Sequence, residues 1–552
     1  MRTKIAALSL VVAMLPLGCS NTGPSKSATI PTGQELVRQI ASHCTDLDAP
    51  ELGEGKLCID NGFRVTADDF SFANWGRSQE ADANVTVQTL IDLFGHSAVC
   101  TSGPTSECVL RPVTTQKLEE WNNAISGGRC EGLSTLSTRF FLKLDDPATF
   151  RSNASRVADL ERNDEDLSSS IVYWWATQFL TEVSDRASTS RTRSPLQLVD
   201  DLIQGLANGV GYTVGLYFGA SGHSVTPFAV TQRGTNFVIH VYDNNAPGIR
   251  REILVDGRTN SWSYVASQMQ GSDKRTEWSG GVGSLELTPM SARQGPFECP
   301  FCTTVQPDEP TIITLASRDS RSPGYISITT RNGKRIMASP ASVLNEIEGA
   351  KYTVSKGATG GLITVVIPSS AKDFDVGVRR GSSVVPAGDV VVNIRRPLMP
   401  SIQVSGDLAH VLVGSSAQSD SLLAVRKEGT SVIAPSTNSA RISIASGSSL
   451  TRTELTSGHT LLVKQIASDS IEVAIKGRNG SVISSTELDA SEQPSVSEIT
   501  LVLSDEGSIV TTQAAIAPVP VMVQSSFNFT PGHAPEKPTT SVPSSIVIAL
   551  PD

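Results

Sequence analysis

The sequence predicts an α+β domain followed by all-β domains, and three observations support this fold class. Apolar residues recur at helical spacing between about residues 86 and 206. Between residues 211 and 257 the apolar period changes to two, which is typical of strands joined by turns. Beyond about residue 306, short runs rich in valine and isoleucine alternate with Gly, Ser, Asn and Asp. Helices followed by an antiparallel sheet indicate an α+β arrangement, and the later runs indicate further β domains.

The helical pattern occurs in segments of ordinary length. They are 86–95, 114–125, the stretch that starts at Cys130, 166–183 and 194–206. The last has the clearest start, because Ser194 takes the N-cap position and Pro195 the first helical position. The strand pattern then occurs at 211–218, 223–232, 236–243 and 251–257.

The first twenty residues predict an export signal. Arg2 and Lys4 give it a positive start, and the apolar stretch from Ile5 to Leu17 is too short to cross a bilayer as a mature helix. Polar residues rich in Ser, Thr, Pro and Gly follow, and they predict a tether up to residue 42.

The signal ends in "PLGCS", residues 16–20. This motif resembles the lipobox of bacterial lipoproteins, although Pro16 stands where a leucine is usual. The resemblance implies that residues 1–18 are removed and that Cys19 carries a lipid anchor. An ordinary secretory signal is the alternative, and in both cases the protein leaves the cytoplasm. With the lipid, we expect a place in the cell envelope, anchored to a bacterial membrane and facing outside the cytoplasm.

Composition argues against several classes of function. The net charge is -10, and no basic patch is interleaved with aromatic residues, so a nucleic-acid partner is not expected. The chain has no P-loop, no G-x-G-x-x-G and no H-E-x-x-H motif. We therefore expect neither a metal nor an organic cofactor.

One cysteine remains without a disulfide partner when the others are assigned. They stand at positions 19, 44, 58, 100, 108, 130, 299 and 302. Exported proteins tend to pair their cysteines, and the close spacings suggest Cys44–Cys58, Cys100–Cys108 and Cys299–Cys302, although sequence cannot fix the connectivity. With Cys19 lipidated, Cys130 has no partner.

The pair in "CPFC", residues 299–302, also matches the spacing of redox-active cysteines. No βαβ pattern surrounds it, however, and β-rich sequence follows directly. We interpret it as a local disulfide clip, and no second Cys/His pair stands near it to complete a zinc site.

The surroundings of Cys130 fit a nucleophile. In "GGRCEGLS", residues 127–134, glycines allow a tight turn and a helix begins at or near the cysteine. A helix N-terminus stabilises a thiolate, and its N–H groups can face a developing oxyanion. His223 starts a strand 93 residues later, and Asp243 ends the next strand. On adjacent strands, Asp243 would hold the imidazole of His223 through Nδ1–H.

These residues, in the order Cys, His, Asp, resemble the papain-like cysteine peptidases, closest to transglutaminase-like and bacteriocin-peptidase-like members. The motifs are Gly-Gly-x-Cys-x-Gly, Gly-His-Ser-Val and Tyr-Asp-x-Asn-x-Pro, and the resemblance covers roughly residues 110–260. It implies that Cys130 is the nucleophile, His223 the general base and acid, and Asp243 the residue that orients His223.

The family also places a glutamine before the cysteine to help form the oxyanion hole. This chain has Ala124 at the matching position. Asn122 and Asn123 are the candidate replacements, since either amide can donate a hydrogen bond.

Plainer interpretations of these residues stay open. Cys130 could be a buried small hydrophobe or a disulfide partner, His223 a satisfied strand-end histidine, and Asp243 a turn residue. Asn245 is an alternative orienting residue. His240 is a rival base, but strand alternation turns it away from the face that Asp243 shares.

The whole-chain prediction follows from these segments. The boundaries are 1–18 for the signal peptide, 19–42 for the lipidated tether, 43–305 for a papain-like α+β domain, 306–400 and 401–515 for β-sandwich domains of immunoglobulin-like or similar type, and 516–552 for a Pro-rich C-terminal segment. Two functions compete. One is a thiol-dependent hydrolase or acyl transferase acting on peptide or amide bonds of a peptide or protein substrate. The other is an inactive surface adhesion or scaffold lipoprotein that binds through its β domains.

Overall fold

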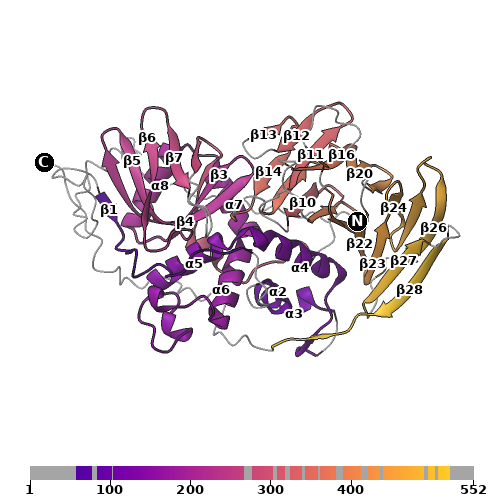
Figure 1. Cartoon of the computed structure of the whole chain (residues 1–552), viewed down its shortest axis with the longest axis horizontal. Helices are drawn as coiled ribbons and strands as arrows, with labels where there is room; N and C mark the ends of the chain where they lie inside the picture. The colour runs from indigo at the N-terminus through magenta and orange to yellow at the C-terminus, as the bar shows by residue number, and fades with distance from the viewer. Residues whose placement is uncertain are drawn as a thin grey trace, which may run out of the picture.

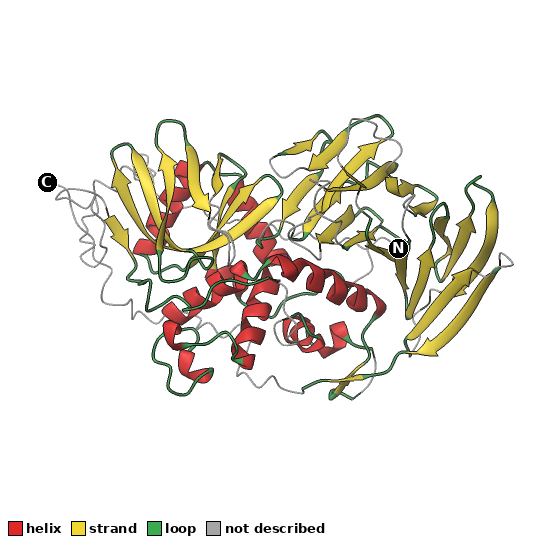
Figure 2. Ribbon diagram, viewed as in Figure 1, coloured by secondary structure: helices red, strands yellow, loops and turns green. Residues whose placement is uncertain are grey.

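The computed structural model describes residues 58–76, 84–101, 104–266, 276–302, 307–317, 324–338, 342–357, 361–380, 389–408, 410–411, 421–434, 439–489, 491, 495–503 and 508–522. Cys19, Cys44, the signal peptide and the tether lie outside the described residues. A helical region is followed by a largely β region, as predicted (Figures 1 and 2).

The α-helices of the described chain lie before residue 208. They are α2 (Val87–Phe94), α3 (His96–Val99), α4 (Pro112–Ala124), α5 (Cys130–Phe141), α6 (Glu165–Ala176), α7 (Thr181–Arg191) and α8 (Pro195–Ala207). The predicted cap of α8 is confirmed, because Ser194 accepts a hydrogen bond from the N–H of Gln197. The prediction of a single helix over 166–183 is wrong. Helix α6 ends at Ala176, because the side chains of Thr177 and Gln178 bond to backbone carbonyl groups and compete with helical hydrogen bonds.

The first sheet is antiparallel and follows the helices. Its strands are β1 (Cys58–Asp60), β3 (Tyr212–Phe218), β4 (Ser221–Arg233), β5 (Asn236–Tyr242), β6 (Arg250–Asp256), β7 (Ser261–Ala266), β8 (Thr276–Gly280) and β9 (Leu285–Pro289). They lie in the order β8-β7-β6-β5-β4-β3-β9, and β1 also pairs with β4. All four strands predicted from period two are present.

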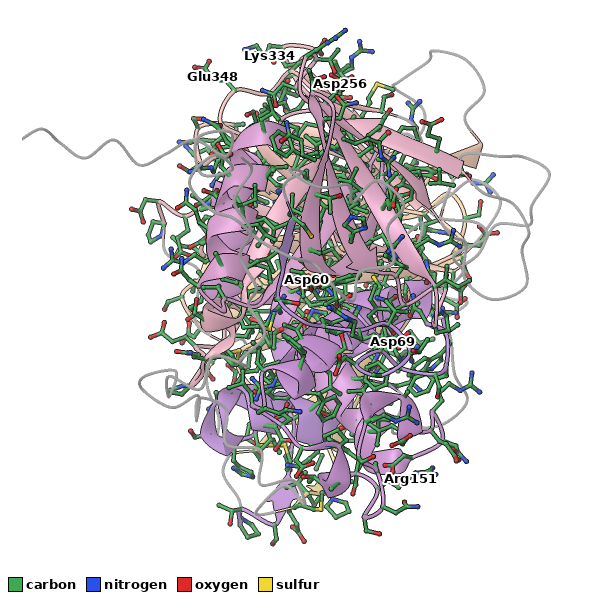
Figure 3. All side chains as sticks on the ribbon, turned by 90° about the vertical axis from the view of Figure 1, so that its left-hand side faces the viewer. Asp60, Asp69, Arg151, Asp256, Lys334 and Glu348 are labelled. Carbon is green, nitrogen blue, oxygen red and sulfur yellow. A yellow bond between two sulfur atoms is a disulfide. The ribbon has the colours of Figure 1, made fainter. Side chains whose placement is uncertain are left out.

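Helices cover both faces of this sheet. Leucines of α8 pack with Val225 of β4 in one apolar core, whereas the next residue, Thr226, bonds to Ser134 and Ser137 of α5. In Figure 3, Asp256 marks the end of the sheet that lies away from the helical part, and Arg151 lies in the helical part at the other end of the view. The hydrogen bonds of Thr226 place the junction between the sheet and the helical part where α5 meets β4.

The rest of the described chain forms two larger sheets. One has the order β14-β15-β10-β17-β18-β22-β23-β27-β28, and the other β13-β12-β11-β16-β20-β21-β24-β25-β26, with β19 pairing β16. The bounds are β10 (Thr311–Ser317), β11 (Gly324–Thr330), β12 (Arg335–Ala338), β13 (Val343–Asn345), β14 (Lys351–Val354), β15 (Ile363–Ile367), β16 (Phe374–Arg380), β17 (Val390–Arg395), β18 (Ser401–Gly406), β19 (His410–Val411), β20 (Ser421–Arg426), β21 (Gly429–Ile433), β22 (Ala440–Ser446), β23 (Ser449–Leu455), β24 (Thr460–Ala467), β25 (Ser470–Lys476), β26 (Val482–Asp489), β27 (Ser497–Leu503) and β28 (Ile509–Ala515).

Both sheets cross the boundary predicted at residue 400. Strand β17 pairs with β18 across it in one sheet, and β16 pairs with β20 in the other. A single apolar core joins residues of the two sheets, from Ile313 to Leu501. The two sheets therefore share one interior, as in a β-sandwich.

The C-terminal part of the described chain returns to the helical region. Strand β29 (Val519–Pro520) pairs with β2 (Glu107–Cys108), and Figure 1 shows this segment running back beneath the helices. None of the helices in the described residues is long and apolar enough to span a membrane.

Candidate active site

Cys130 is the first residue of α5 and is completely buried. Gly128, two residues earlier, has φ = 123°, a conformation that favours glycine, and it ends a short 3-10 helix (Ile125–Gly127). The N–H of Arg129 then donates to Oδ1 of Asn74 at 2.7 Å. The turn into the helix is therefore fixed just before the cysteine.

Gly132 lets α5 approach α6 closely. A Cβ at this position would lie 2.0 Å from the backbone oxygen of Ile171. Two glycines of "GGRCEGLS" thus have distinct structural roles, because Gly128 turns the chain and Gly132 allows the helices to pack.

His223 and Asp243 meet at one end of the sheet. Nε2 of His223, on β4, lies 2.7 Å from Oδ1 of Asp243, which follows β5. The contact between these two residues agrees with the expectation from sequence, but the expected ring nitrogen is wrong. Because the carboxylate takes Nε2, the other ring nitrogen, Nδ1, is left for Cys130.

Asp243 is held by two further donors. The hydroxyl of Tyr264 donates to Oδ2 at 2.5 Å, and the N–H of Asn245 donates to Oδ1 at 2.9 Å. Burial opposes ionisation of Asp243, but the charge of His223 and these hydrogen bonds outweigh it and lower the pKa of the carboxyl group. Asp243 is therefore an anion at neutral pH.

His223 interacts with both Asp243 and Cys130, and we call these three residues the trio. Burial lowers its pKa, but the charge of Asp243, the hydrogen bond to Asp243, and hydrogen-bond and charge interactions with Cys130 together raise that pKa to about 10. The structure thus brings Cys130, His223 and Asp243 together, with His223 as an imidazolium between two partners that favour its charge.

Asn244 connects the elements that carry the trio. Its Nδ2 donates to the backbone oxygen of Cys130 at 3.1 Å, to Oγ of Ser134 at 3.0 Å and to the backbone oxygen of Ser224 at 2.9 Å. Sequence reasoning missed this role because "DNNAPG" looks like an ordinary turn. It also missed Asn74 and Tyr264, because no local pattern links either residue to the trio.

The alternatives to the trio lie elsewhere. His240 bonds through Nε2 to Oγ1 of Thr231 at 2.8 Å, on the face opposite to Asp243, as strand alternation predicted. The side chain of Asn245 accepts from Nδ2 of Asn74 at 3.0 Å, so Asn245 contacts Asp243 through its backbone.

The two candidate oxyanion donors have other partners. Both polar ends of Asn122 bond to the backbone of Val85, and Nδ2 of Asn123 donates to the backbone oxygen of Glu119 within α4. The structure therefore does not bring these amides to Cys130. The side chain that bonds to the turn before Cys130 is instead that of Asn74, which accepts from the N–H of Arg129.

The cysteine pairing leaves Cys130 free. Cys100–Cys108 and Cys299–Cys302 are disulfides, which confirms two of the predicted pairs. Cys58 is disulfide-bonded, and its predicted partner Cys44 lies outside the described residues. Among the described cysteines, Cys130 is the free thiol.

The trio is closed off from solvent in this structure. Cys130 and Asp243 are 0% exposed and His223 is 4% exposed. The residue after the cysteine, Glu131, is also fully buried and forms ion pairs with Arg293 and Lys356. Lys356 comes from the β region, so no local sequence signal could have linked it to the site.

Within the described residues, no group of three or more His, Cys, Asp or Glu side chains could hold a metal ion. No protein-family model matches this chain, and no curated protein sequence matches it.

Proposed function

We propose that the protein is a thiol-dependent hydrolase or acyl transferase of papain-like type that acts on peptide or amide bonds. The observation that supports this most directly is the series of contacts from Cys130 to His223 to Asp243, with Cys130 at a helix N-terminus. A nucleophile, a base in contact with it and a group that orients the base are the components that such chemistry needs.

The reaction would proceed in two balanced steps. The sulfur of Cys130 attacks the amide carbon and forms a C–S bond, while His223 gives a proton to the leaving nitrogen as the C–N bond breaks. The product is a thioester on Cys130 and a free amine. Water or a second amine then attacks the thioester carbon and gives its proton to His223, and the C–S bond breaks to restore the thiolate and the imidazolium.

The helix start can assist at the carbonyl oxygen. The first N–H groups of an α-helix lack intrahelical acceptors, and they lie at the positive end of the helix dipole. With Cys130 as the first residue of α5, the negative charge that develops on the substrate oxygen would form next to these donors.

The proposed location is the cell envelope. The lipobox-like "PLGCS" motif would anchor the mature chain through Cys19, with residues 20–42 as a tether. The disulfides Cys100–Cys108 and Cys299–Cys302 support an oxidising compartment.

The test is alkylation of Cys130 in the folded, unreduced chain. Iodoacetamide should label Cys130, as mapped by mass spectrometry, and the label should be absent in Cys130→Ala. His223→Ala should slow labelling by at least about tenfold, because the positively charged ring that contacts the sulfur is gone. His459→Ala, a histidine on the β region that bonds to Thr456, is the matched control and should leave the rate unchanged. A labelling rate that does not depend on His223 would contradict the proposal.

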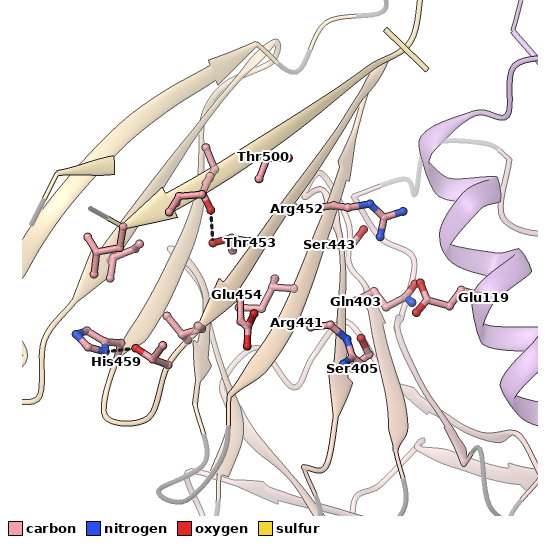
Figure 4. A pocket seen from close by; sticks show the side chains of 17 residues that line it. Glu119, Gln403, Ser405, Arg441, Ser443, Arg452, Thr453, Glu454, His459 and Thr500 are labelled. Atoms are coloured by element: carbon pink, nitrogen blue, oxygen red, sulfur yellow. Dashed lines mark hydrogen bonds between the residues drawn. The ribbon is translucent and has the colours of Figure 1, made fainter. Parts of the chain in front are cut away.

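A second candidate function is binding through the β region without catalysis. A cavity of about 600 Å³ lies along strands β22, β23 and β27, and Figure 4 shows Arg441, Arg452 and Gln403 around it, with Glu119 of α4 opposite. This cavity and the complete burial of Cys130 favour a scaffold role. That role would be supported if Cys130→Ala and the wild type behaved alike in every assay of envelope function.

A further inference from the structure

A hairpin loop of the β region reaches the candidate active site. It joins β14 to β15, and its base is closed by two hydrogen bonds: the N–H of Ser355 to the oxygen of Leu362 at 2.8 Å, and the N–H of Leu362 to Oγ of Ser355 at 2.7 Å. Residues 358–360 of this loop lie outside the described residues.

The described side of the loop lies between the two segments that carry Cys130 and His223. The N–H of Gly357 donates to the oxygen of Gly222 at 3.2 Å, in an isolated antiparallel bridge, and Gly222 directly precedes His223. A Cβ at Gly357 would lie 3.3 Å from the oxygen of Gly128, two residues before Cys130. This bridge supplies one main-chain hydrogen bond of the kind that an added peptide strand makes with a sheet edge.

Lys356 is held by the site itself. Its Nζ lies 2.6 Å from Oε1 of Glu286 and 2.9 Å from Oε1 of Glu131, and its side chain is 3% exposed. The backbone N–H of the lysine also donates to Oε1 of Gln178 at 2.7 Å. A buried lysine is stable only when it is paired in this way.

Each of the two carboxylates has a second counter-charge besides Lys356. Glu131 also pairs with Arg293, and Glu286 lies 3.5 Å from Arg191. Burial raises the pKa of Glu131, but Lys356 first and then Arg293 outweigh it, and the result is a pKa lowered to about 2. Without the lysine, each carboxylate keeps one arginine: Arg293 for Glu131 and Arg191 for Glu286.

The space beside Lys356 and Glu286 is only partly filled. Glu286 fits beside Gly215, where a Cβ would lie 2.7 Å from its Cγ. Lys356 and Glu286 also line a cavity of about 330 Å³ between the α+β part and the β region. The loop therefore has free volume next to it.

We propose that Glu131 and Glu286 form a specificity pocket for a cationic side chain, and that the loop occupies it as a tethered mimic of the substrate. This rests on the proposed function of Cys130. The substrate class is an extended peptide with a lysine followed by a small residue, because a Cβ at the position of Gly357 would already lie 3.3 Å from the oxygen of Gly128. Catalysis then requires the loop to leave.

Opening the loop should expose Cys130. Gly357→Val places methyl groups against the oxygen of Gly128, and Lys356→Met removes the cation while keeping a long side chain. Both variants should raise the rate of Cys130 alkylation by at least about tenfold, because reaction of a buried thiol follows the fraction of open molecules. Gly281→Val, where a Cβ meets nothing within 4 Å, is the control. Equal alkylation rates in the wild type and both folded variants would overturn the proposal.

The pocket is tested with a peptide. Acetyl-Val-Ser-Lys-Gly-Ala-amide, which copies residues 354–358, should protect Cys130 from alkylation in Gly357→Val. The same peptide with leucine in place of lysine should not. Equal protection by both peptides, or by neither, would remove the assignment of Glu131 and Glu286 as the pocket.

The outcome also separates this inference from the proposed function. If the loop variants expose Cys130 but its reactivity is the same with and without His223, the loop closes a site that is not a catalytic one. If the wild type reacts as fast as Gly357→Val and the rate depends on His223, the catalytic pair stands and the closing role of the loop is wrong.

Discussion

At the scale of single residues, the charge of His223 follows from what surrounds it. Burial alone would favour the neutral imidazole, and it is opposed by Asp243 on one ring nitrogen and Cys130 on the other. The balance is a pKa raised to about 10. Each of the two partners can be replaced separately, so the contribution of each to this pKa can be measured.

Replacement of Asp243 by asparagine should lower the pKa of His223. The amide keeps an acceptor for Nε2–H but removes the negative charge that outweighs burial. The pKa should fall well below about 10, as followed by the pH dependence of the imidazole signals in NMR spectra. An unchanged titration of His223 would show that Asp243 does not control its charge.

The same pKa shift predicts how stability changes with pH. A histidine whose pKa is higher in the folded state stabilises fully below its unfolded pKa, and this contribution is lost as the pH rises through the folded pKa. For His223 the window runs from 6.5 to about 10. We expect the difference in unfolding free energy between wild type and His223→Asn to fall across this window, by at most about 1.4 kcal/mol per pH unit. Urea titrations at several pH values measure it, and a difference that is constant with pH would contradict the shift.

At the scale of secondary-structure elements, the site depends on how closely α5 can lie against α6. Gly132 faces the backbone oxygen of Ile171, which cannot move away as a flexible side chain could. Gly132→Ala should therefore lower the free energy of unfolding by about 1–3 kcal/mol, the usual cost of overpacking. Gly281→Ala, with open space around it, should change it by less than about 0.5 kcal/mol. Equal urea midpoints for the two variants would show that α5 has room to shift.

The elements also show where sequence reasoning succeeds. The helix start at Cys130 and the strands of His223 and Asp243 could be predicted because glycines, capping residues and apolar periodicity act locally. The supporting contacts could not. Tyr264 reaches Asp243 from two strands away, and Lys356 reaches Glu131 from the β region, and neither contact leaves a pattern in the neighbouring residues.

At the scale of the whole molecule, the α+β part and the β region are joined by buried polar contacts. Nε2 of Gln116 on α4 donates to the backbone oxygen of Ser443 at 2.9 Å and to its Oγ at 3.1 Å. Oγ1 of Thr314 donates to Oε2 of Glu120 at 2.5 Å, and the loop with Lys356 adds a third contact. The sequence pattern around residue 400 suggested a boundary, but alternating apolar residues cannot show which strands share a sheet.

These contacts predict that the two parts unfold together. All six tryptophans lie before residue 306, so their fluorescence follows the α+β part, whereas far-ultraviolet circular dichroism also follows the β region. The two signals should have the same urea midpoint, because separation would leave buried polar groups without partners. Gln116→Ala should lower both urea midpoints together, because it lowers the free energy of unfolding by about 1–2 kcal/mol. The exposed Gln513→Ala on β28 should shift neither. Two distinct midpoints in the wild type would mean that the β region folds independently, and the loop that closes Cys130 could then be released without unfolding the site.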